Sequence, residues 1–251
     1  MRHASILAAV TALAMLSSLG CESTPLDPVE GPAGEALEPA AAQQPLDPAL
    51  CALDRPGYTL DSQNAFFPLG VGSRWFLEGE EDGELLELRV KVMNRTRPVG
   101  GVLTRVIEER EWVDGELLEV SRNFFAEASD GTTCYFGEEV DIYEGGVIVS
   151  HEGEWRADEP GNQPGIFMPA DPEPGMTYAM EGAPGIAEDE GRIIRSRPVE
   201  VPAGFFKKED TVWVQESNPL EGGEGDVKVF GEGVGLLVDG PVELLEYFVV
   251  D

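Results

Sequence analysis

The sequence is poor in histidine, which most metal and acid–base sites require. It has two histidines, His3 near its start and His151, and a single remaining imidazole cannot build a histidine-rich zinc or iron site. Ser150 and Glu152 flank His151, but neighbours on a strand point to opposite faces, so Ser150 cannot serve as its nucleophile. We expect an exposed strand-end histidine, and neither a catalytic residue, nor a bound metal, nor a cofactor.

Positive charge is also scarce. The chain has 17 lysines and arginines against 48 aspartates and glutamates, for a formal net charge of −31. Such a surface repels nucleic-acid phosphates and anionic lipid headgroups. We therefore exclude nucleic acid as a partner and interpret the acidity as a solvated surface, with a reservoir for divalent cations as the alternative.

Long apolar runs are absent except at the start of the chain. The run at 6–16 follows Arg2 and is too short for a bilayer, which needs about 20 residues, so it is typical of a cleavable export signal. We expect a signal peptide over residues 1–20.

Cys21 follows this run, directly after a small residue. The arrangement resembles the lipobox of bacterial lipoproteins, in which the cysteine becomes the new N-terminus and carries acyl chains. Leucine usually stands three residues before that cysteine; here the position is Ser18, and Leu19 or Leu16 serves instead. We expect lipidation of Cys21, which anchors the protein in a membrane of the bacterial cell envelope, on the periplasmic or surface side of the outer membrane. An ordinary secretory signal is the alternative.

Residues 22–50 contain no aromatic residue, lysine or arginine. A segment with so little to bury cannot offset its ordering entropy. Together with the lipidated cysteine it predicts a disordered tether over 21–50.

Residues 51–251 lack a convincing helical face. Apolar and polar residues alternate over 86–92, and Asp-Gly or Gly-Gly pairs at 82–83, 114–115, 130–131 and 145–146 predict tight turns. Expected strands include 102–113, 117–126, 132–136, 141–143 and 147–149. We expect one all-β domain of about ten to twelve strands, an antiparallel meander curled into a barrel or half-barrel. A two-sheet sandwich is the alternative.

Beyond Cys21, the chain has only two cysteines, Cys51 and Cys134. An exported protein meets an oxidising compartment, which predicts a Cys51–Cys134 disulfide. Two free, buried thiols are the alternative.

Four short stretches carry a further resemblance. Residues 67–75, 135–138, 152–155 and 164–170 resemble a group of uncharacterised secreted bacterial proteins. In that group an aromatic residue is expected before Tyr135, where this chain has Cys134. The resemblance implies a single exported domain and no particular activity.

Carboxylates cluster in three places that could bind calcium. None has the spacing of a known calcium loop, and in so acidic a chain such clusters arise by chance. The clusters are Asp130 with Glu138, Glu139 and Asp141; Asp171 with Glu173; and Glu188, Asp189 and Glu190.

Glu152 and Glu154 lie close to Trp155 in the sequence. A glycosidase requires at least two carboxyl groups, and here two stand beside an aromatic residue. We expect both on one face of a solvated strand. The tryptophans, Trp75, Trp112, Trp155 and Trp213, either fill the core or line an apolar cavity in the curved sheet.

These observations predict a lipid-anchored envelope protein, not an enzyme, with a binding or structural role towards a small apolar ligand or an envelope protein. A carrier of a small apolar ligand within the curved sheet is one alternative. A carboxylate-dependent hydrolase of envelope glycans is the other.

Overall fold

The computed structural model describes residues 44–194, 196–220 and 222–250. These form strands and two short 3-10 helices, η1 (Pro48–Cys51) and η2 (Lys208–Asp210), with no α-helix in the described ranges. The all-β prediction is confirmed. Within the same ranges, no helix has the length and apolarity needed to cross a membrane.

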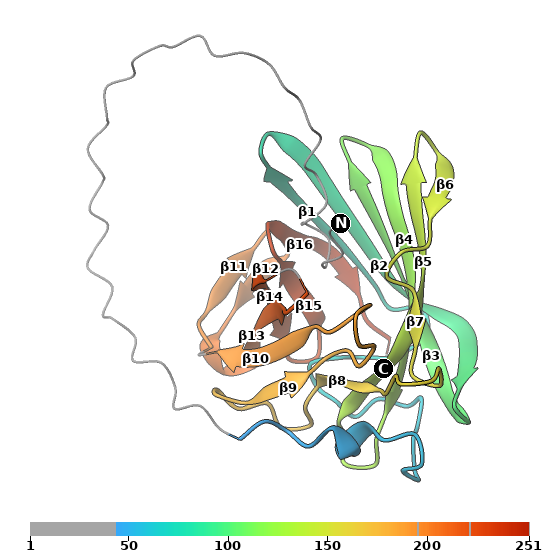
Figure 1. The fold of residues 1–251 in the computed structure, drawn as a ribbon. Coiled ribbons are helices and arrows are strands. Elements are labelled where there is room, and N and C mark those ends of the chain that lie inside the picture. Colours follow the sequence, from blue (N-terminus) through green and yellow to red (C-terminus); the bar gives the residue numbers. More distant parts are fainter. Residues whose placement is uncertain (1–43, 195, 221, 251) are drawn as a thin grey trace.

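One antiparallel sheet of 14 strands dominates the structure (Figure 1). Its first half is a meander of long strands: β1 (Arg74–Glu81), β2 (Glu84–Val99), β3 (Val102–Val113), β4 (Glu116–Glu127) and β5 (Thr133–Glu144). Three short strands then pair with β5: β6 (Val147–Ser150), β7 (Trp155–Arg156) and β8 (Gly165–Met168).

The second half of the sheet returns towards the first. It comprises β9 (Thr177–Ala179), β10 (Glu190–Ile194), β13 (Thr211–Asn218), β14 (Gly223–Gly231), β15 (Gly235–Asp239) and β16 (Val242–Phe248). The last of these pairs with β1, so the strand order runs from β6 through β5 to β1, then β16 to β13, β10 and β9. A separate two-stranded ribbon contains β11 (Val199–Val201) and β12 (Gly204–Phe206).

The turns of the first meander follow the sequence. Asp114 and Gly115 have φ angles of 48° and 79°, and Asp82 and Gly83 have 52° and 87°. Positive φ at both central residues is what a two-residue hairpin turn requires, and Asp-Gly tolerates it best. These local signals explain why β3 has the bounds expected from its sequence.

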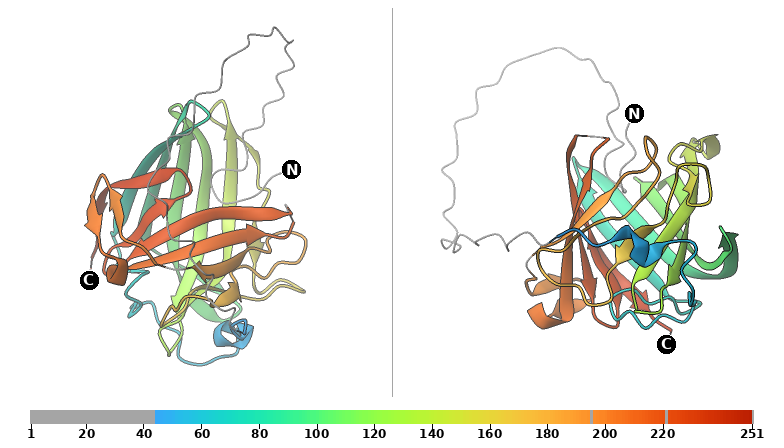
Figure 2. Two further views of the ribbon diagram at one scale, coloured as in Figure 1. Left: turned by 90° about the vertical axis from the view of Figure 1, so that its left-hand side faces the viewer. Right: turned by 60° about the horizontal axis from the view of Figure 1, so that its bottom comes forward.

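The sheet curls so that its two halves face each other (Figure 2). In the left-hand view, the orange and red strands of the second half cross in front of the long green strands. At the open side, the Gln163 amide donates to the Gly182 carbonyl at 2.8 Å, but β8 and β9 share no hydrogen-bonded ladder. The result is a curled, open sheet with an interior, which corresponds to the half-barrel form of the prediction.

The segment before β1 packs against one end of this sheet. The Leu46 amide donates to the Thr177 carbonyl at 2.9 Å, and Leu46 and Leu50 pack on the core. Packed structure thus already includes residues ahead of Cys51, the expected start of the domain. Cys21 and the signal peptide over 1–20 lie outside the described residues.

A candidate ligand-binding cavity

The interior of the curled sheet contains a cavity of about 200 Å³. Strands from both halves of the sheet line it, among them β3, β4 and β5 on one side and β13, β14 and β15 on the other. Nine lining residues are aspartate or glutamate and one, Lys228, is a cation. The cavity is therefore strongly acidic as well as partly apolar.

Strand register builds the acidic wall. On β3, Ile107, Glu109 and Glu111 alternate with outward-facing residues and line the cavity. Glu111 lies opposite Glu119 of β4, while Glu109 lies opposite Ser121. Cross-strand neighbours on one face have Cβ atoms about 5 Å apart, so the wall gathers three carboxyl groups at one end.

A β-bulge adds a fourth carboxyl group from β5. Tyr135 pairs with Phe125 and Glu138 pairs with Asn123. Between these two pairs β5 advances by three residues and β4 by only two, so β5 contains one extra residue. The extra residue brings Tyr135 and Glu138 to the same face, and both line the cavity. The bulge passes through Gly137, whose φ of 122° few other residues adopt.

The facing wall holds a buried ion-pair network. Lys228 Nζ lies 2.9 and 3.0 Å from the two oxygens of Asp239 and 3.4 Å from Glu216 Oε2. Burial alone would lower the pKa of Lys228, but the carboxylates of Asp239 and Glu216 outweigh it and hold that pKa well above its usual range. Lys228 therefore stays charged, with carboxylate partners on its own wall.

The other end of the cavity is aromatic. Phe67 lies with its ring centroid 4.7 Å from that of Phe167 and 5.0 Å from that of Phe125. Phe125 stacks on Tyr135 at 4.8 Å, and Phe230 completes the group against Phe67. The Tyr135 hydroxyl donates to Asn123 Oδ1 at 2.6 Å, which fixes the ring at the boundary between the aromatic and acidic ends.

Burial among like charges shifts the pKa of several cavity carboxyls. Burial raises the pKa of Glu109 to about 7, partly offset by Lys228. Burial, then Glu119 and Glu109, raises the pKa of Glu111 well above its usual range. On the side near β5, burial followed by Asp189 raises the pKa of Glu181 to about 8. Burial followed by Glu181 raises the pKa of Glu138 well above its usual range. Part of the wall is thus protonated at neutral pH.

Glu111 differs from its neighbours in one respect. It is 7% exposed, yet within the described residues its carboxyl group has neither a hydrogen-bond donor nor an ion-pair partner. Buried polar groups are normally hydrogen-bonded. Its environment consists of the cavity, the carboxyls of Glu109, Glu119 and Asp239, and the more distant charge of Lys228.

Two lining residues are exposed to solvent and mark where the cavity opens. Ile186 is 44% exposed, and Glu152 lies in the exposed turn after β6. A small molecule can enter on this side, where β9 and β10 end the sheet.

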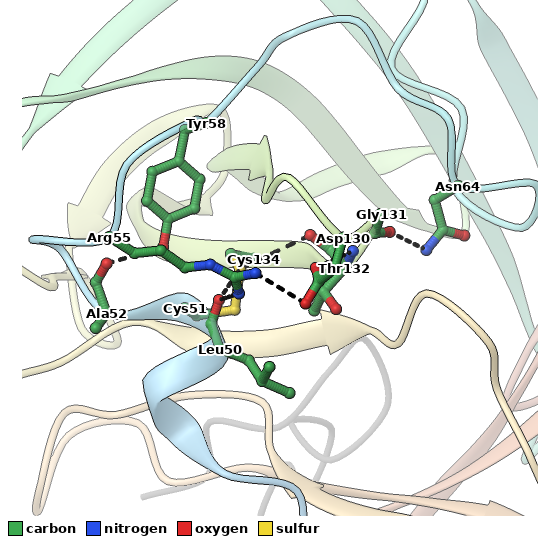
Figure 3. A network of polar contacts seen from close by, with 10 residues as sticks. All are labelled: Leu50, Cys51, Ala52, Arg55, Tyr58, Asn64, Asp130, Gly131, Thr132 and Cys134. Atoms are coloured by element: carbon green, nitrogen blue, oxygen red, sulfur yellow. Dashed lines mark hydrogen bonds and ion pairs between the residues drawn. A yellow bond between two sulfur atoms is a disulfide. The ribbon is translucent and has the colours of Figure 1, made fainter.

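The disulfide between Cys51 and Cys134 is present, with Cα atoms 5.5 Å apart. Figure 3 shows how the segment around it is fastened to the turn at Asp130. Arg55 donates to the Leu50 carbonyl and forms an ion pair of 2.9 Å with Asp130. The predicted bridge is therefore confirmed, and it lies at the end of the sheet near the aromatic group.

In the first candidate calcium cluster, three of the four carboxylates form ion pairs with arginines. Asp130 pairs with Arg55, and Asp141 pairs with Arg122 at 2.9 Å. Of the other two members of this cluster, Glu139 pairs with Arg97 at 3.1 Å, whereas Glu138 lines the cavity. Asp189 of the third cluster also lines the cavity. In the described ranges, no group of three or more histidine, cysteine, aspartate or glutamate residues is arranged to hold a metal ion.

The expectation for Glu152 and Glu154 is wrong in its geometry. Glu152 lies in a turn, and Glu154 lies between that turn and β7, so the two carboxyls do not share a strand face. The turn is set by Gly153, whose φ is 90°. His151 follows β6 with its side chain 60% exposed and lies 3.1 Å from Asp141 Oδ1, which confirms its predicted place at a strand end.

One tryptophan lines the cavity, one fills the core, and the other two stack under arginines. Trp75 lines the cavity, where its Nε1 donates to the Val234 carbonyl at 2.7 Å, and Trp155 is buried in the core. Trp112 and Trp213 instead stack under Arg89 and Arg197, at 4.5 and 4.3 Å from the ring centroids.

Sequence reasoning missed the carboxylates of the cavity: Glu109, Glu111, Glu119, Glu181, Glu216 and Asp239. One signal was present. The run from Glu108 to Glu111 places charge on both faces of an expected strand, and a strand in a curled sheet has one face inside. Charge on both faces therefore indicates a polar interior.

We compared the chain with protein-family models, curated proteins and solved structures, and found no match in any of the three.

Proposed function

We propose that the protein is a non-catalytic, small-molecule-binding lipoprotein of the bacterial cell envelope. The observation that carries the binding role is the cavity of about 200 Å³ inside the curled sheet. A sheet built only to support other structure would fill its interior with close-packed apolar side chains. Here the interior is hollow, polar at one end and aromatic at the other, as ligand sites commonly are.

The envelope assignment rests on the leader and on Cys21. Multiple acyl chains on that cysteine would provide stable attachment to a membrane. The expected tether, shortened by the residues from Leu46 onwards that pack on the domain, would let the domain stand away from anionic headgroups that its own negative charge repels. A domain placed in this way can capture a small molecule at the cell surface or in the periplasm.

Native mass spectrometry of the full-length protein, extracted from membranes in a mild detergent, tests this proposal. We expect an organic adduct of one molecule per chain, lost in Ser121→Trp, which places an indole in the cavity. The control Thr96→Trp adds the same group at an exposed position of β2 and should keep the adduct. The same mass reports whether residues 1–20 are absent and whether Cys21 carries acyl chains.

Absence of any adduct, together with no thermal stabilisation by a library of small molecules, would contradict the binding role. A mass that retains residues 1–20, or lacks acyl chains, would contradict the lipoprotein assignment.

A carboxylate-dependent hydrolase of envelope glycans is the second candidate. The raised pKa values of Glu109 and Glu138 beside other carboxyls are what a general acid needs at neutral pH. Incubation of the purified protein with cell-wall glycans distinguishes the two functions. Release of reducing ends that disappears in Glu138→Gln and Glu109→Gln would favour the hydrolase.

A further inference from the structure

We propose that the cavity selects an organic cation: an ammonium or amidinium group carried by a small aromatic or apolar body. The inference rests on the proposed binding function and names the chemical class of the ligand.

The charge inventory of the cavity supports this class. Nine lining residues are acidic, and the single lining cation, Lys228, already lies within 3.4 Å of both Asp239 and Glu216. The wall formed by β3 and β4 therefore has no cation of its own among the described lining residues. An anionic ligand would add charge of the same sign at a low dielectric, where like charges repel strongly and burial of a further charge is itself unfavourable.

Glu111 supplies a second, independent observation. The residue is 7% exposed and lines the cavity, and its carboxyl group has no hydrogen-bond donor or ion-pair partner within the described residues. A ligand that brings N–H donors and positive charge provides the missing partner. Charge-assisted hydrogen bonds of this kind are about twice as strong as neutral ones.

The aromatic end defines the rest of the ligand. Phe67, Phe125, Phe167 and Tyr135 surround the space next to the acidic wall. A volume of about 200 Å³ suits a single ring or a short chain, since engineered cavities of about 150 Å³ hold benzene. An ammonium group also gains from nearby aromatic faces.

A metal ion fits less well. Calcium takes six to eight oxygen ligands at about 2.3–2.6 Å, and no group of three or more candidate ligands is so arranged in the described ranges. An organic cation instead needs one or two carboxylates and an apolar surface, which the cavity offers.

Isothermal titration calorimetry on the detergent-extracted full chain tests the inference with three matched probes: 2-phenylethylammonium, 2-phenylethanol and phenylacetate. At pH 7 we expect the cation to bind at least about tenfold more tightly than the alcohol, and the anion not to bind. Glu111→Gln keeps the shape of the side chain and should weaken the cation about tenfold without changing the alcohol. Glu246→Gln removes one exposed charge on β16 and should change neither.

Proton release gives a further readout. An arriving cation lowers the pKa of the carboxyls around it, so binding at pH 7 should release protons, detected by titration in buffers of different ionisation enthalpy. Of the charged groups around Glu111 and Glu109, Glu119 lies on the same wall. Those on the facing wall are Glu216, Asp239 and Lys228.

The possible outcomes separate the inference from the proposed function. Equal affinity for cation and alcohol, or an unchanged affinity in Glu111→Gln, would refute cation selection and leave ligand binding in place. A neutral or anionic native adduct, or one-for-one displacement of the cation by micromolar calcium, would refute it as well. If no probe binds, a cationic native adduct still supports the inference, whereas a protein without any adduct contradicts both proposals.

Discussion

The buried side chain of Lys228 links three neighbouring strands of the sheet. Its ammonium group lies between Asp239 and Glu216 on the wall opposite Glu111. Three strands, β13 to β15, contribute to this contact. Without the lysine, two carboxylates would remain buried with no opposite charge between them.

Lys228→Met should therefore lower the free energy of unfolding by about 3–5 kcal/mol, the usual cost of removing one partner of a buried pair. Urea unfolding followed by tryptophan fluorescence measures the change. Lys91→Met, at an exposed position of β2, is the control and should cost less than about 0.5 kcal/mol. Similar effects for the two variants would mean that the pair contributes little.

The cavity carboxyls make stability depend on pH in an unusual direction. In the folded protein the pKa of Glu109 is raised from 4.5 to about 7 and that of Glu181 to about 8. Between about pH 5 and 8 the folded protein binds more protons than the unfolded chain, so the free energy of unfolding falls as pH rises. One pKa unit corresponds to about 1.4 kcal/mol, or about 3–6 °C in Tm for a domain of this size.

We expect the Tm of the ligand-free protein to be about 5 °C or more lower at pH 8.5 than at pH 5.5. Differential scanning calorimetry at high ionic strength, which screens surface repulsion, measures it. Glu111→Gln removes one of the raised carboxyls and should flatten the profile. A Tm that rises over this pH range would show that these groups ionise normally.

Among the elements, β5 is the one whose irregularity creates the site. The bulge at Gly137 lets the strand continue from Thr133 to Glu144 and turns Glu138 inward. A Cβ at Gly137 would lie 2.3 Å from the Trp155 carbonyl oxygen. The close approach of β7 therefore requires glycine at this position.

Gly137→Ala should cost about 3 kcal/mol, from backbone strain and from displacement of β7. Gly145→Ala, with φ of 57° and no atom within 4 Å of the new Cβ, should cost about 1 kcal/mol. Chemical denaturation measures both, and ligand binding should weaken only in the first. Equal costs would mean that β7 can move away from the bulge.

A loop before β1 carries Phe67 into the aromatic end, and Glu127 of β4 holds this loop. Glu127 is 2% exposed, and its carboxylate accepts hydrogen bonds from the Gln63 amide at 2.6 Å and the Asn64 amide at 2.8 Å. Ser62 Oγ donates a third at 3.0 Å.

Glu127→Ala leaves the amides of Gln63 and Asn64 without this acceptor, at about 1–3 kcal/mol each, whereas Ser62 Oγ can still donate to the Phe67 carbonyl. We expect a loss of about 3 kcal/mol or more in stability and faster amide hydrogen exchange over residues 59–68, read by mass spectrometry. Glu116→Ala, at the exposed start of the same strand, is the control. Unchanged exchange in Glu127→Ala would show that other contacts hold the loop.

At the scale of the whole molecule, the Cys51–Cys134 disulfide joins the segment before the sheet to β5, the last long strand of the first meander. It spans 83 residues, for which the chain-entropy estimate is about 4.5 kcal/mol. The double variant Cys51→Ser, Cys134→Ser should lose about 4 kcal/mol in urea unfolding. A reducing agent should destabilise the wild-type protein equally and leave the variant unchanged. Coincident curves with and without reductant would contradict this expectation.

Local patterns in the sequence predicted the first half of the sheet well. The alternation over 102–113 and the Asp-Gly pairs define β3 and its turns without help from distant residues. The disulfide also followed from two cysteines in a chain that we expect to be exported. In contrast, 132–136 and 141–143 were expected as separate strands. Gly137 interrupts the local pattern, and the continuous strand is evident only from the pairing of Tyr135 with Phe125 and of Glu138 with Asn123.

The candidate site could not be predicted, because it depends on pairings between distant strands. Glu111 and Asp239 approach each other only through the curl that places β15 opposite β3. No local pattern encodes that curl. At Glu152 and Gly153 a turn forms where a strand was expected, because the glycine adopts a positive φ.

The pairing of β1 with β16 has a consequence for biosynthesis. Arg74 lies opposite Phe248. The first strand of the sheet to be synthesised, β1, can therefore form this pairing only after the last strand, β16, has been synthesised. Until β16 emerges, the edge of β1 has unpaired amides and carbonyls, and an edge of this kind can pair with another chain. Long-range pairing of this sort also folds slowly. The nascent chain therefore depends on protection from aggregation until β16 has been synthesised.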